Sequence, residues 1–370
     1  MADEATNRGS FEVQAGYCSA MDAPVTTRLC RSIGRAITRE TATGRAVLDW
    51  PGDPVADAMV LRLMGGFHAL HRAGADPALS QVFLGGVTGD DAVDGIIAHT
   101  LTAHDAALLP WLAGPPQTNE AGRSAGLMTG LLHLAARFSG RFGPKMTLLE
   151  IGSSAGLNLL IDRYGYDLGG VRAGPVPAEL LIKPEWRGPV PPTAPVDIVG
   201  ARGVDIAPVD LSDDAAAERL AAYVWVDAVE RQARIDTAIA MVRRYGVQLD
   251  AGDAADWVEA RLAEPQPAGV MRVLVHSVVW QYLPKQGRDR ISAAMAAAGA
   301  SATPERPLGW VMMEPNRDLH RHEIRVRGWP GDTPMELVAL THAHGAWVEG
   351  LSPPYETRGY VMRGGGSSET

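Results

Sequence analysis

Apolar residues recur every three or four positions from Phe11 to about Leu112, as the run from Val60 to Leu70 illustrates. This spacing is that of amphipathic helices, and the segment lacks the strict alternation expected of half-buried strands. Glycine and proline interrupt the pattern at residues 51–54, 85–86 and 114–116. The pattern predicts a helical N-terminal domain at 1–115, which we interpret as a lid or substrate domain.

From Met146 the pattern changes to short apolar runs separated by helical stretches. The first run ends in Glu150-Ile151-Gly152, and an apolar helix pattern follows from Leu157 to Tyr164. A strand, a glycine-bearing turn and a helix in this order are what a nucleotide-type ligand site requires. Gly152 lets the backbone turn sharply off the strand, and Gly156 lets the helix approach the strand and a ligand closely.

The turn reads Gly152-Ser153-Ser154-Ala155-Gly156 and departs from the dinucleotide fingerprint G-x-G-x-x-G. Together with Glu150 its pattern is E-x-G-x-x-x-G, and Ser154 occupies the position of the missing middle glycine. Ser153 or Ser154 can cap the helix, whose N-terminus then offers free N–H groups and a partial positive charge to a carboxylate or phosphate. An ordinary strand-to-helix turn is the alternative interpretation.

The rest of the chain predicts an α/β domain at 116–352, followed by a tail at 353–370. A stretch rich in glycine and proline at 166–195 is interpreted as an insertion, with one strand-like piece at 180–186. The continuous apolar run Val270–Val279 predicts a central strand buried on both faces. Other strands are expected at 196–199 leading into 202–206, 247–250, 308–313, 335–341 and 346–349, and helices at 124–137, 220–245 and 289–298. Because a tight turn joins the last two strands, they must be antiparallel.

Acidic residues follow several of the predicted strands. An acidic residue after the second strand can accept hydrogen bonds from both ribose hydroxyls of a nucleotide. Asp205 fits this position and Asp210 competes for it, although the insertion makes the gap longer than the usual ~20 residues. After the third strand, Asp253 and Ala254 suit adenine recognition, and a turn with a helix-capping aspartate is the alternative. Glu314 ends the fifth strand.

His276 and Ser277 interrupt the central strand near its carboxyl end. Ligands of open α/β sheets bind outside the carboxyl ends of the strands. A histidine in this position can therefore act as a general base or orient a substrate, and we take Ser277 as a ligand contact beside it. A hydrogen-bonded core histidine is the alternative interpretation of His276.

A polar cluster, Gln117, Asn119 and Arg123, opens the helix that returns the chain to the first strand. The cluster is well placed to lie over the ligand turn, and Arg123 can pair with a carboxylate. The alternative is a helix that Asn119 simply caps.

Histidines occur in close pairs at 68 and 71, 320 and 322, and 342 and 344. Residues with these spacings share one face of a helix or strand and can bind an ion together. Because no acidic residue or cysteine completes a recognisable ligand set, we predict no metal site.

The composition is that of a globular protein, with 46% apolar and 21% charged residues in a chain of 370. A net charge of −9 without a long basic run argues against nonspecific nucleic-acid binding. Two cysteines imply neither a disulfide framework nor a cysteine-rich zinc site. The chain shows no signal-peptide core and no apolar run of membrane-spanning length, so we expect a cytoplasmic protein without membrane or nucleic-acid partners.

Five motifs extend the argument beyond the turn: QTNEAGR from Gln117, LLEIGSSAGLNLLIDRYGY from Leu148, RGVDIAPVDL from Arg202, GDAADW from Gly252 and HGAW from His344. Together they resemble a family of uncharacterised bacterial proteins, a domain of unknown function, from FEVQAGYC at Phe11 onwards. The wider group that they resemble is the class I S-adenosylmethionine (SAM)-dependent methyltransferases, whose first motif is D/E-x-G-x-G-x-G. The resemblance implies a Rossmann-like, seven-stranded, mostly parallel sheet and a SAM site, but no particular substrate.

We therefore expect a SAM-dependent methyltransferase that acts on a small-molecule acceptor. In this hypothesis Glu150 and the Gly152–Gly156 turn position the methionine part, Asp205 holds the ribose, and Asp253 with Ala254 holds the adenine. The cluster of Gln117, Asn119 and Arg123 closes over the carboxylate end, and His276 is the candidate base. Two alternatives stay open: a degenerate methyltransferase fold that binds a ligand or partner, and an NAD-type oxidoreductase. The missing middle glycine and the terminal hairpin argue against the oxidoreductase.

Overall fold

The computed structural model describes residues 3–138, 145–331 and 333–352. The chain divides into two compact units, Met1–Thr118 with Asp210–Asp236, and Asn119–Val209 with Thr237–Thr370. The sequence places a single boundary at residue 115, whereas the structure also returns 210–236 to the first unit. The tail expected at 353–370 lies outside the described residues.

The first unit is built from helices, and its described residues contain no strand. Asp3, Thr41 and Asp76 each cap a helix by accepting a hydrogen bond from a backbone N–H group of its first turn. Apolar side chains from these helices, such as Phe11 and Leu63, form one buried core. The elements are α1 (Glu4–Ala20), α2 (Pro24–Ala36), α3 (Ala42–Leu48), α4 (Met59–Arg72), α5 (Pro77–Phe83), α6 (Asp90–Ala103), α7 (Asp105–Leu108), η1 (Leu109–Ala113), α9 (Asp214–Ala222) and the start of α10 (Val229–Tyr245).

The returning segment 210–236 is held to the first unit by hydrogen bonds. Asp227 accepts two backbone N–H groups at the start of α2, at 2.8 and 2.9 Å. The Nδ1 atom of His68 lies 2.9 Å from the carbonyl oxygen of Ala222. These contacts involve the break between α9 and α10, where the sequence predicts one helix over 220–245. The prediction of one helix is wrong: the chain leaves the helix after Ala222, whose carbonyl binds His68, and the Asp227 side chain in the break binds α2.

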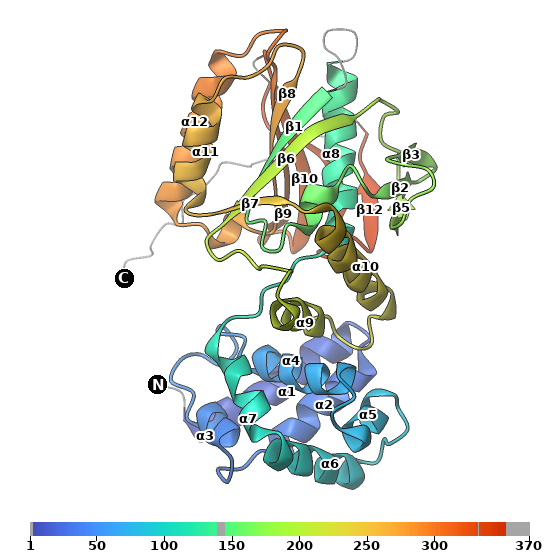
Figure 1. The fold of residues 1–370 in the computed structure, drawn as a ribbon, viewed down its shortest axis with the longest axis vertical. Coiled ribbons are helices and arrows are strands. Elements are labelled where there is room, and N and C mark those ends of the chain that lie inside the picture. Colours follow the sequence, from blue (N-terminus) through green and yellow to red (C-terminus); the bar gives the residue numbers. More distant parts are fainter. Residues whose placement is uncertain (1–2, 139–144, 332, 353–370) are drawn as a thin grey trace. The chain divides into compact units, whose positions relative to one another are not determined.

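The second unit carries a nine-stranded sheet in the order β5-β12-β11-β10-β9-β8-β1-β6-β7 (Figure 1). Neighbours from β7 through β6, β1 and β8 to β9 run parallel. Among these parallel strands the chain order is third, second, first, fourth, fifth, as in dinucleotide-binding sheets. The strands are β1 (Lys145–Ile151), β5 (Glu185–Arg187), β6 (Asp197–Asp205), β7 (Gln248–Ala251), β8 (Met271–Ser277), β9 (Leu308–Asn316), β10 (Arg321–Trp329), β11 (Glu336–Thr341) and β12 (Trp347–Gly350).

The other half of the sheet differs from the expected seven-stranded arrangement. β9, β10, β11 and β12 follow one another as antiparallel neighbours, and β5 pairs with β12 in parallel. The predicted hairpin of the last two strands is confirmed, but the sequence analysis did not predict β10. In β10, buried Glu323 and Arg325 pair with each other at 2.7 Å and alternate with apolar Ile324 and Val326. The molecule is therefore an α/β protein with a larger, mixed sheet, and the seven-stranded description is wrong.

Helices cover both faces of the sheet. α11 (Ala254–Ala263) and α12 (Lys285–Ala300) lie on one face, and α8 (Ser124–Arg137) lies on the other (Figure 1). Leu149 and Ile151 of β1 and Trp310 of β9 belong to the apolar cluster that includes residues of α11 and α12. Because side chains alternate between faces along a strand, Glu150 points to the α8 face and Glu314, four residues after Trp310, to the α12 face.

The segment after β1 forms one 3-10 turn, η3 (Leu157–Leu160), in place of the predicted helix. Asn119 Oδ1 accepts the N–H group of Leu157, and the phenol of Tyr164 donates to the Leu157 carbonyl. The phenol of Tyr164 thus occupies a carbonyl that a continued helix would use, and with a single 3-10 turn the argument from a helix N-terminus no longer applies. A small sheet follows, made of β2 (Gly165–Leu168), β3 (Val171–Ala173) and β4 (Leu181–Ile182). The strand-like piece predicted at 180–186 is split between β4 and β5.

Candidate functional site

The carboxyl ends of the parallel strands form one edge of the sheet, and the switch point of the topology lies between β1 and β8. From β1 the chain continues to β6 on one side, whereas β8 lies on the other. Ligands of open α/β sheets bind outside the strand ends at such a point. Ionisable residues lie at all five of these ends, namely Glu150, Asp205, Asp250, His276 and Glu314. We therefore take this edge as the candidate site.

Gly152 begins the turn after β1 with a φ of +68°, in the left-handed region that favours glycine. A Cβ atom at Gly152 would lie 2.3 Å from Cγ2 of Val279. Val279 follows β8, so the two chain segments that leave the switch point touch at this glycine. The turn requires glycine both for its backbone angle and for this close contact.

Hydrogen bonds from β6 fix the rest of the turn. The N–H groups of Gly152 and Ser153 both donate to the carbonyl oxygen of Val204, at 2.9 and 3.1 Å. The N–H group of Ser154 donates to the carboxylate of Asp205 at 2.8 Å. The structure thus brings Asp205 to the turn, as the strand order requires.

Three buried polar atoms beside this turn have no hydrogen-bond partner among the described residues: Glu150 Oε2, Ser154 Oγ and Asn158 Oδ1. Asn158 donates its amide to the other oxygen of Glu150 at 3.2 Å. Burial raises the pKa of Glu150 to about 7, although the hydrogen bond from Asn158 opposes the shift. An unpaired buried polar atom costs about 1–3 kcal/mol, so three in one place indicate a polar partner that these residues do not supply.

The polar segment before α8 also lies at the site. Asn119 reaches the turn through its 2.9 Å hydrogen bond with the N–H group of Leu157. Arg123, in η2 (Ala121–Arg123), is buried, and its Nε donates to the carbonyl oxygen of Ala343 at 3.0 Å. Its positive charge opposes the effect of burial on the pKa of Glu150. Gln117, the third member of the predicted cluster, belongs to the first unit.

His276 is fully buried and has a hydrogen-bond partner on each ring nitrogen. Trp310 Nε1 lies 3.0 Å from Nε2 of His276, and Glu314 Oε1 lies 2.7 Å from Nδ1. An indole nitrogen can only donate, so Nε2 accepts and the ring proton lies on Nδ1, which donates to Glu314. Trp280 also stacks on the imidazole. This geometry is that of the alternative for His276, a hydrogen-bonded core histidine.

Three residues other than glycine have left-handed backbone angles at this edge, Ser154 with φ +52°, Val278 with φ +57° and His320 with φ +48°. For a β-branched residue such as valine this conformation is a genuine outlier. The N–H group of Val278 donates to the Met313 carbonyl at 3.0 Å, and that of Val279 donates to Glu314 at 3.1 Å. Strain of this kind costs about 1–3 kcal/mol and clusters at ligand sites and switch regions.

The remaining predicted contacts occupy positions in the fold that need no ligand to explain them. Asp253 caps α11 by accepting the N–H groups of the second and third residues of that helix, and Ala254 is its first residue. Ser277 is buried at the end of β8, opposite Met313. Ala155 is buried in the turn and Gly156 closes it with a φ of +76°. Asp210, the competitor of Asp205, belongs to the first unit and accepts the N–H group of Ser212.

The histidine pairs occupy three different settings. His68 and His71 stack on Phe83 within the first unit. Burial lowers the pKa of His322, and the charge of Arg123 lowers it further. The rings of His342 and His344 lie 5.4 Å apart. Over the described ranges of the chain, no group of three or more His, Cys, Asp or Glu side chains is placed to hold a metal ion.

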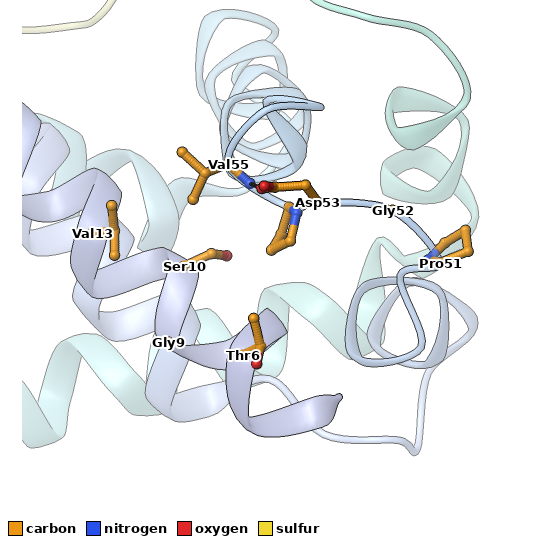
Figure 2. Close-up of a pocket in the computed structure, with 9 residues that line it drawn as sticks. Thr6, Gly9, Ser10, Val13, Pro51, Gly52, Asp53 and Val55 are labelled. Atoms are coloured by element: carbon orange, nitrogen blue, oxygen red, sulfur yellow. Dashed lines mark hydrogen bonds between the residues drawn. The ribbon is translucent and has the colours of Figure 1, made fainter. Parts of the chain in front are cut away.

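The first unit has a groove of its own, of about 720 Å³, between α1 and the loop at 51–55 (Figure 2). Gly9, Ser10 and Val13 line one side of it, and prolines line the other. Asp53 is the ionisable side chain among the lining residues, and its Oδ1 atom accepts two backbone N–H groups of its own loop. The groove therefore offers shape but little chemistry, and the sheet edge is the stronger candidate.

The chain matches the model of a bacterial protein family, described as uncharacterised protein conserved in bacteria (DUF2332), over residues 8–349. The chain belongs to this family. No curated protein and no solved structure matches it. The predicted membership in a bacterial domain-of-unknown-function family is therefore confirmed, and membership covers both structural units. No helix in the described part of the chain is long and apolar enough to cross a membrane.

Sequence reasoning missed three residues of the site, Asn158, Val279 and Trp310. Asn158 lies in the segment predicted as a helix, where it counts as a polar surface position. Val279 and Trp310 belong to apolar strand patterns that indicate only burial. Glu314, a carboxylate at the end of the fifth strand, was the one signal in the sequence for a partner of His276.

Proposed function

We propose that this protein is a SAM-dependent methyltransferase that acts on a small-molecule acceptor. The observation that carries the proposal is the trio of unpartnered buried atoms, Glu150 Oε2, Ser154 Oγ and Asn158 Oδ1, beside the turn after β1. Two of these atoms accept hydrogen bonds, and the hydroxyl can donate or accept. That set fits the ammonium and carboxylate groups of an amino-acid-like ligand end, such as the methionine part of SAM.

The rest of the edge supports the same ligand. Asp205 ends the second parallel strand, where an acidic residue can accept both hydroxyls of a ribose. Its oxygens accept the N–H groups of Ser154 and Ala207, and each keeps a second lone pair for a ligand. Asp253 and Ala254 follow the third parallel strand and would face the adenine. SAM supplies an electrophilic methyl group, and the protein would hold a nucleophile in line with it.

Access to the trio requires movement, because its atoms are closed to water in this structure. Val279 packs on Gly152 and belongs to the segment with the strained residue Val278. We propose that this segment moves outward to admit the ligand. Relief of the strain at Val278 would offset part of the packing free energy that the movement of Val279 costs.

A second candidate function is that of a non-catalytic protein with this fold, which binds a ligand or a partner. The packing of Val279 on Gly152 favours it, because the side chain fills the approach to the turn. The missing middle glycine at Ser154 favours it as well, since a close approach of a ligand to the backbone is harder there.

Isothermal titration calorimetry with SAM, S-adenosylhomocysteine and NAD separates these functions. Binding of both adenosyl compounds without NAD binding supports the methyltransferase. NAD binding alone points to an oxidoreductase, and the absence of all three binding events supports the second candidate.

A substitution at Asn158 tests whether the ligand binds beside the turn after β1. We expect Asn158→Leu, which keeps the branched shape but removes the unpaired acceptor and the amide donor to Glu150, to weaken SAM binding at least about fivefold. Glu305→Gln changes an exposed carboxylate in the same unit and serves as the matched control. If Asn158→Leu folds and binds SAM as the control does, the ligand is not beside this turn.

A further inference from the structure

The α12 face of the same edge holds another unpartnered carboxylate oxygen, separate from the trio. Glu314 uses its Oε1 atom twice, accepting from His276 Nδ1 at 2.7 Å and from the N–H group of Val279 at 3.1 Å. Its Oε2 atom is buried and has no hydrogen-bond partner within the residues that the structure describes. Glu314 is 6% exposed, so bulk water does not supply the hydrogen bond that Oε2 lacks.

The hydrogen bonds around His276 have a fixed direction. Trp310 can only donate, so His276 accepts on Nε2 and donates from Nδ1 to Glu314. Two N–H groups therefore point at Oε1, which requires Glu314 to accept on that atom. The chain of bonds starts at an indole and ends at a carboxylate with one oxygen left for another donor. Oriented in this way, Glu314 Oε2 is a prepared acceptor.

The cross-strand neighbour of Glu314 is a second buried carboxylate, and its charge is compensated in a different way. Glu323 of β10 lies directly opposite Glu314 in the register and is also buried. Two arginines compensate Glu323, Arg321 at 2.8 Å and Arg325 at 2.7 Å. In the described structure, the side chain bound to Glu314 is that of His276, which is a neutral donor and not a cation. Like charges opposite each other on a sheet are destabilising, so a donor at Oε2 would be stabilising.

We propose that Glu314 Oε2 receives an N–H or O–H group of the acceptor molecule and takes its proton. The N–H or O–H bond breaks, the electron pair stays on nitrogen or oxygen, and the proton bonds to the carboxylate, which becomes neutral. His276 and Trp310 are positioning residues that act through Glu314. This inference deepens the proposed methyltransferase function and rests on it for the fate of the nucleophile.

Val279 links this acceptor to the turn after β1. Its side chain packs on Gly152, and its N–H group donates to Glu314. Glu150 and Glu314 point to opposite faces of the sheet, so the two unpartnered carboxylate oxygens mark two subsites with Val279 between them. Outward movement of Val279 would therefore open the turn and release one of the donors that hold Glu314.

The test uses thermal unfolding of the full chain with the smallest ammonium donor, methylammonium, because Oε2 is closed to bulk water. Tetramethylammonium has the same charge but no N–H group and is the reference at equal concentration. We expect the Tm of the wild type to be about 1–3 °C higher with methylammonium than with tetramethylammonium. Glu314→Gln should abolish this difference, and the exposed control Glu305→Gln should keep it. No difference in the wild type, or an equal one in Glu314→Gln, overturns the proposal.

Trp310→Phe tests the positioning role, because it keeps an aromatic ring but loses the indole N–H group. A merely structural role would lower Tm equally in both salts and leave the difference between them intact. We expect the difference itself to shrink, and an unchanged difference overturns the role of Trp310. Calorimetry with SAM separates the two proposals. SAM binding without methylammonium selectivity removes this inference alone. Selectivity without SAM binding removes the proposed function and leaves Glu314 Oε2 as a site that binds a donor.

Discussion

Glu150 is a carboxyl group whose surroundings make protein stability depend on pH. Burial raises its pKa from 4.5 to about 7 in the folded protein, whereas the unfolded chain keeps the ordinary value. The folded state therefore holds the proton more tightly. The stabilisation that this bound proton gives the folded state is complete below about pH 4.5 and is lost as pH rises to about 7. Across this window the free energy of unfolding should fall by up to about 3 kcal/mol from this group.

Glu150→Gln removes that dependence, because the amide is neutral at every pH and its oxygen can still accept from Asn158. We expect urea unfolding to show the variant more stable, relative to wild type, at about pH 8 than at about pH 5. The exposed variant Glu305→Gln should follow the wild type at both pH values. Parallel pH dependence of wild type and Glu150→Gln would contradict the assignment of a raised pKa to this residue.

Among the structural elements, the turn after β1 depends on the fit between Gly152 and Val279. Gly152→Ala places a methyl group 2.3 Å from Val279 Cγ2 in a left-handed backbone conformation. We expect a loss of about 2–5 kcal/mol of stability, from strain and overpacking together. Gly246 also has a positive φ, +70°, but its Cβ position is open. Gly246→Ala therefore measures the backbone cost alone, and it should be the milder change.

A double-mutant cycle isolates the contact between the two residues. Val279→Ala should return part of the stability that Gly152→Ala loses, because the two methyl groups nearest the new Cβ are gone. Urea midpoints of the four proteins give the coupling, and we expect about 1 kcal/mol or more. Additive effects would mean that Val279 does not rest on the turn in solution.

The elements that the sequence predicts well are those with one uninterrupted pattern. α8, β8 and the β11–β12 hairpin agree with expectation because their apolar spacing reports burial directly. The sequence analysis did not predict β10 because one face of this strand carries charged residues, such as Glu323, which are buried as ion pairs. Its alternating Ile324 and Val326 were the available signal. The helix expected after Gly156 is replaced by a 3-10 turn, in which Tyr164 of the same apolar pattern donates to the Leu157 carbonyl.

The candidate site could also be predicted only in part from the sequence. The strand order sufficed to place Glu150, Asp205 and His276 at one edge, since the carboxyl ends of parallel strands meet there. The partners of these side chains depend on register and on the path of the loops. The hydrogen bond from Trp310 to His276, for example, joins residues 34 positions apart on neighbouring strands. A single sequence carries no signal for such a pair.

At the scale of the whole molecule, the chain builds its helical unit from two separate stretches. Residues Met1–Thr118 supply most of it, and Asp210–Asp236 return to complete it. The returning stretch contributes Asp227, which caps α2, and the Ala222 carbonyl that binds His68. The chain thus passes between the units three times, at 118, 209 and 236. A single cut at 118 cannot separate two complete units.

This organisation predicts how fragments behave. A fragment of residues 1–118 lacks the α2 cap and leaves buried polar and apolar groups, including His68, without partners. We expect it to bind a hydrophobic dye and to unfold over a broad temperature range. The same fragment joined by a flexible linker to residues 210–236 should unfold cooperatively, and Asp227→Asn in that fusion should cost about 1–2 kcal/mol. Calorimetry and dye fluorescence on the three proteins decide the matter. Equal cooperativity of the fragment and the fusion would show that the returning stretch is peripheral, because the helical unit would then hold together without its cap.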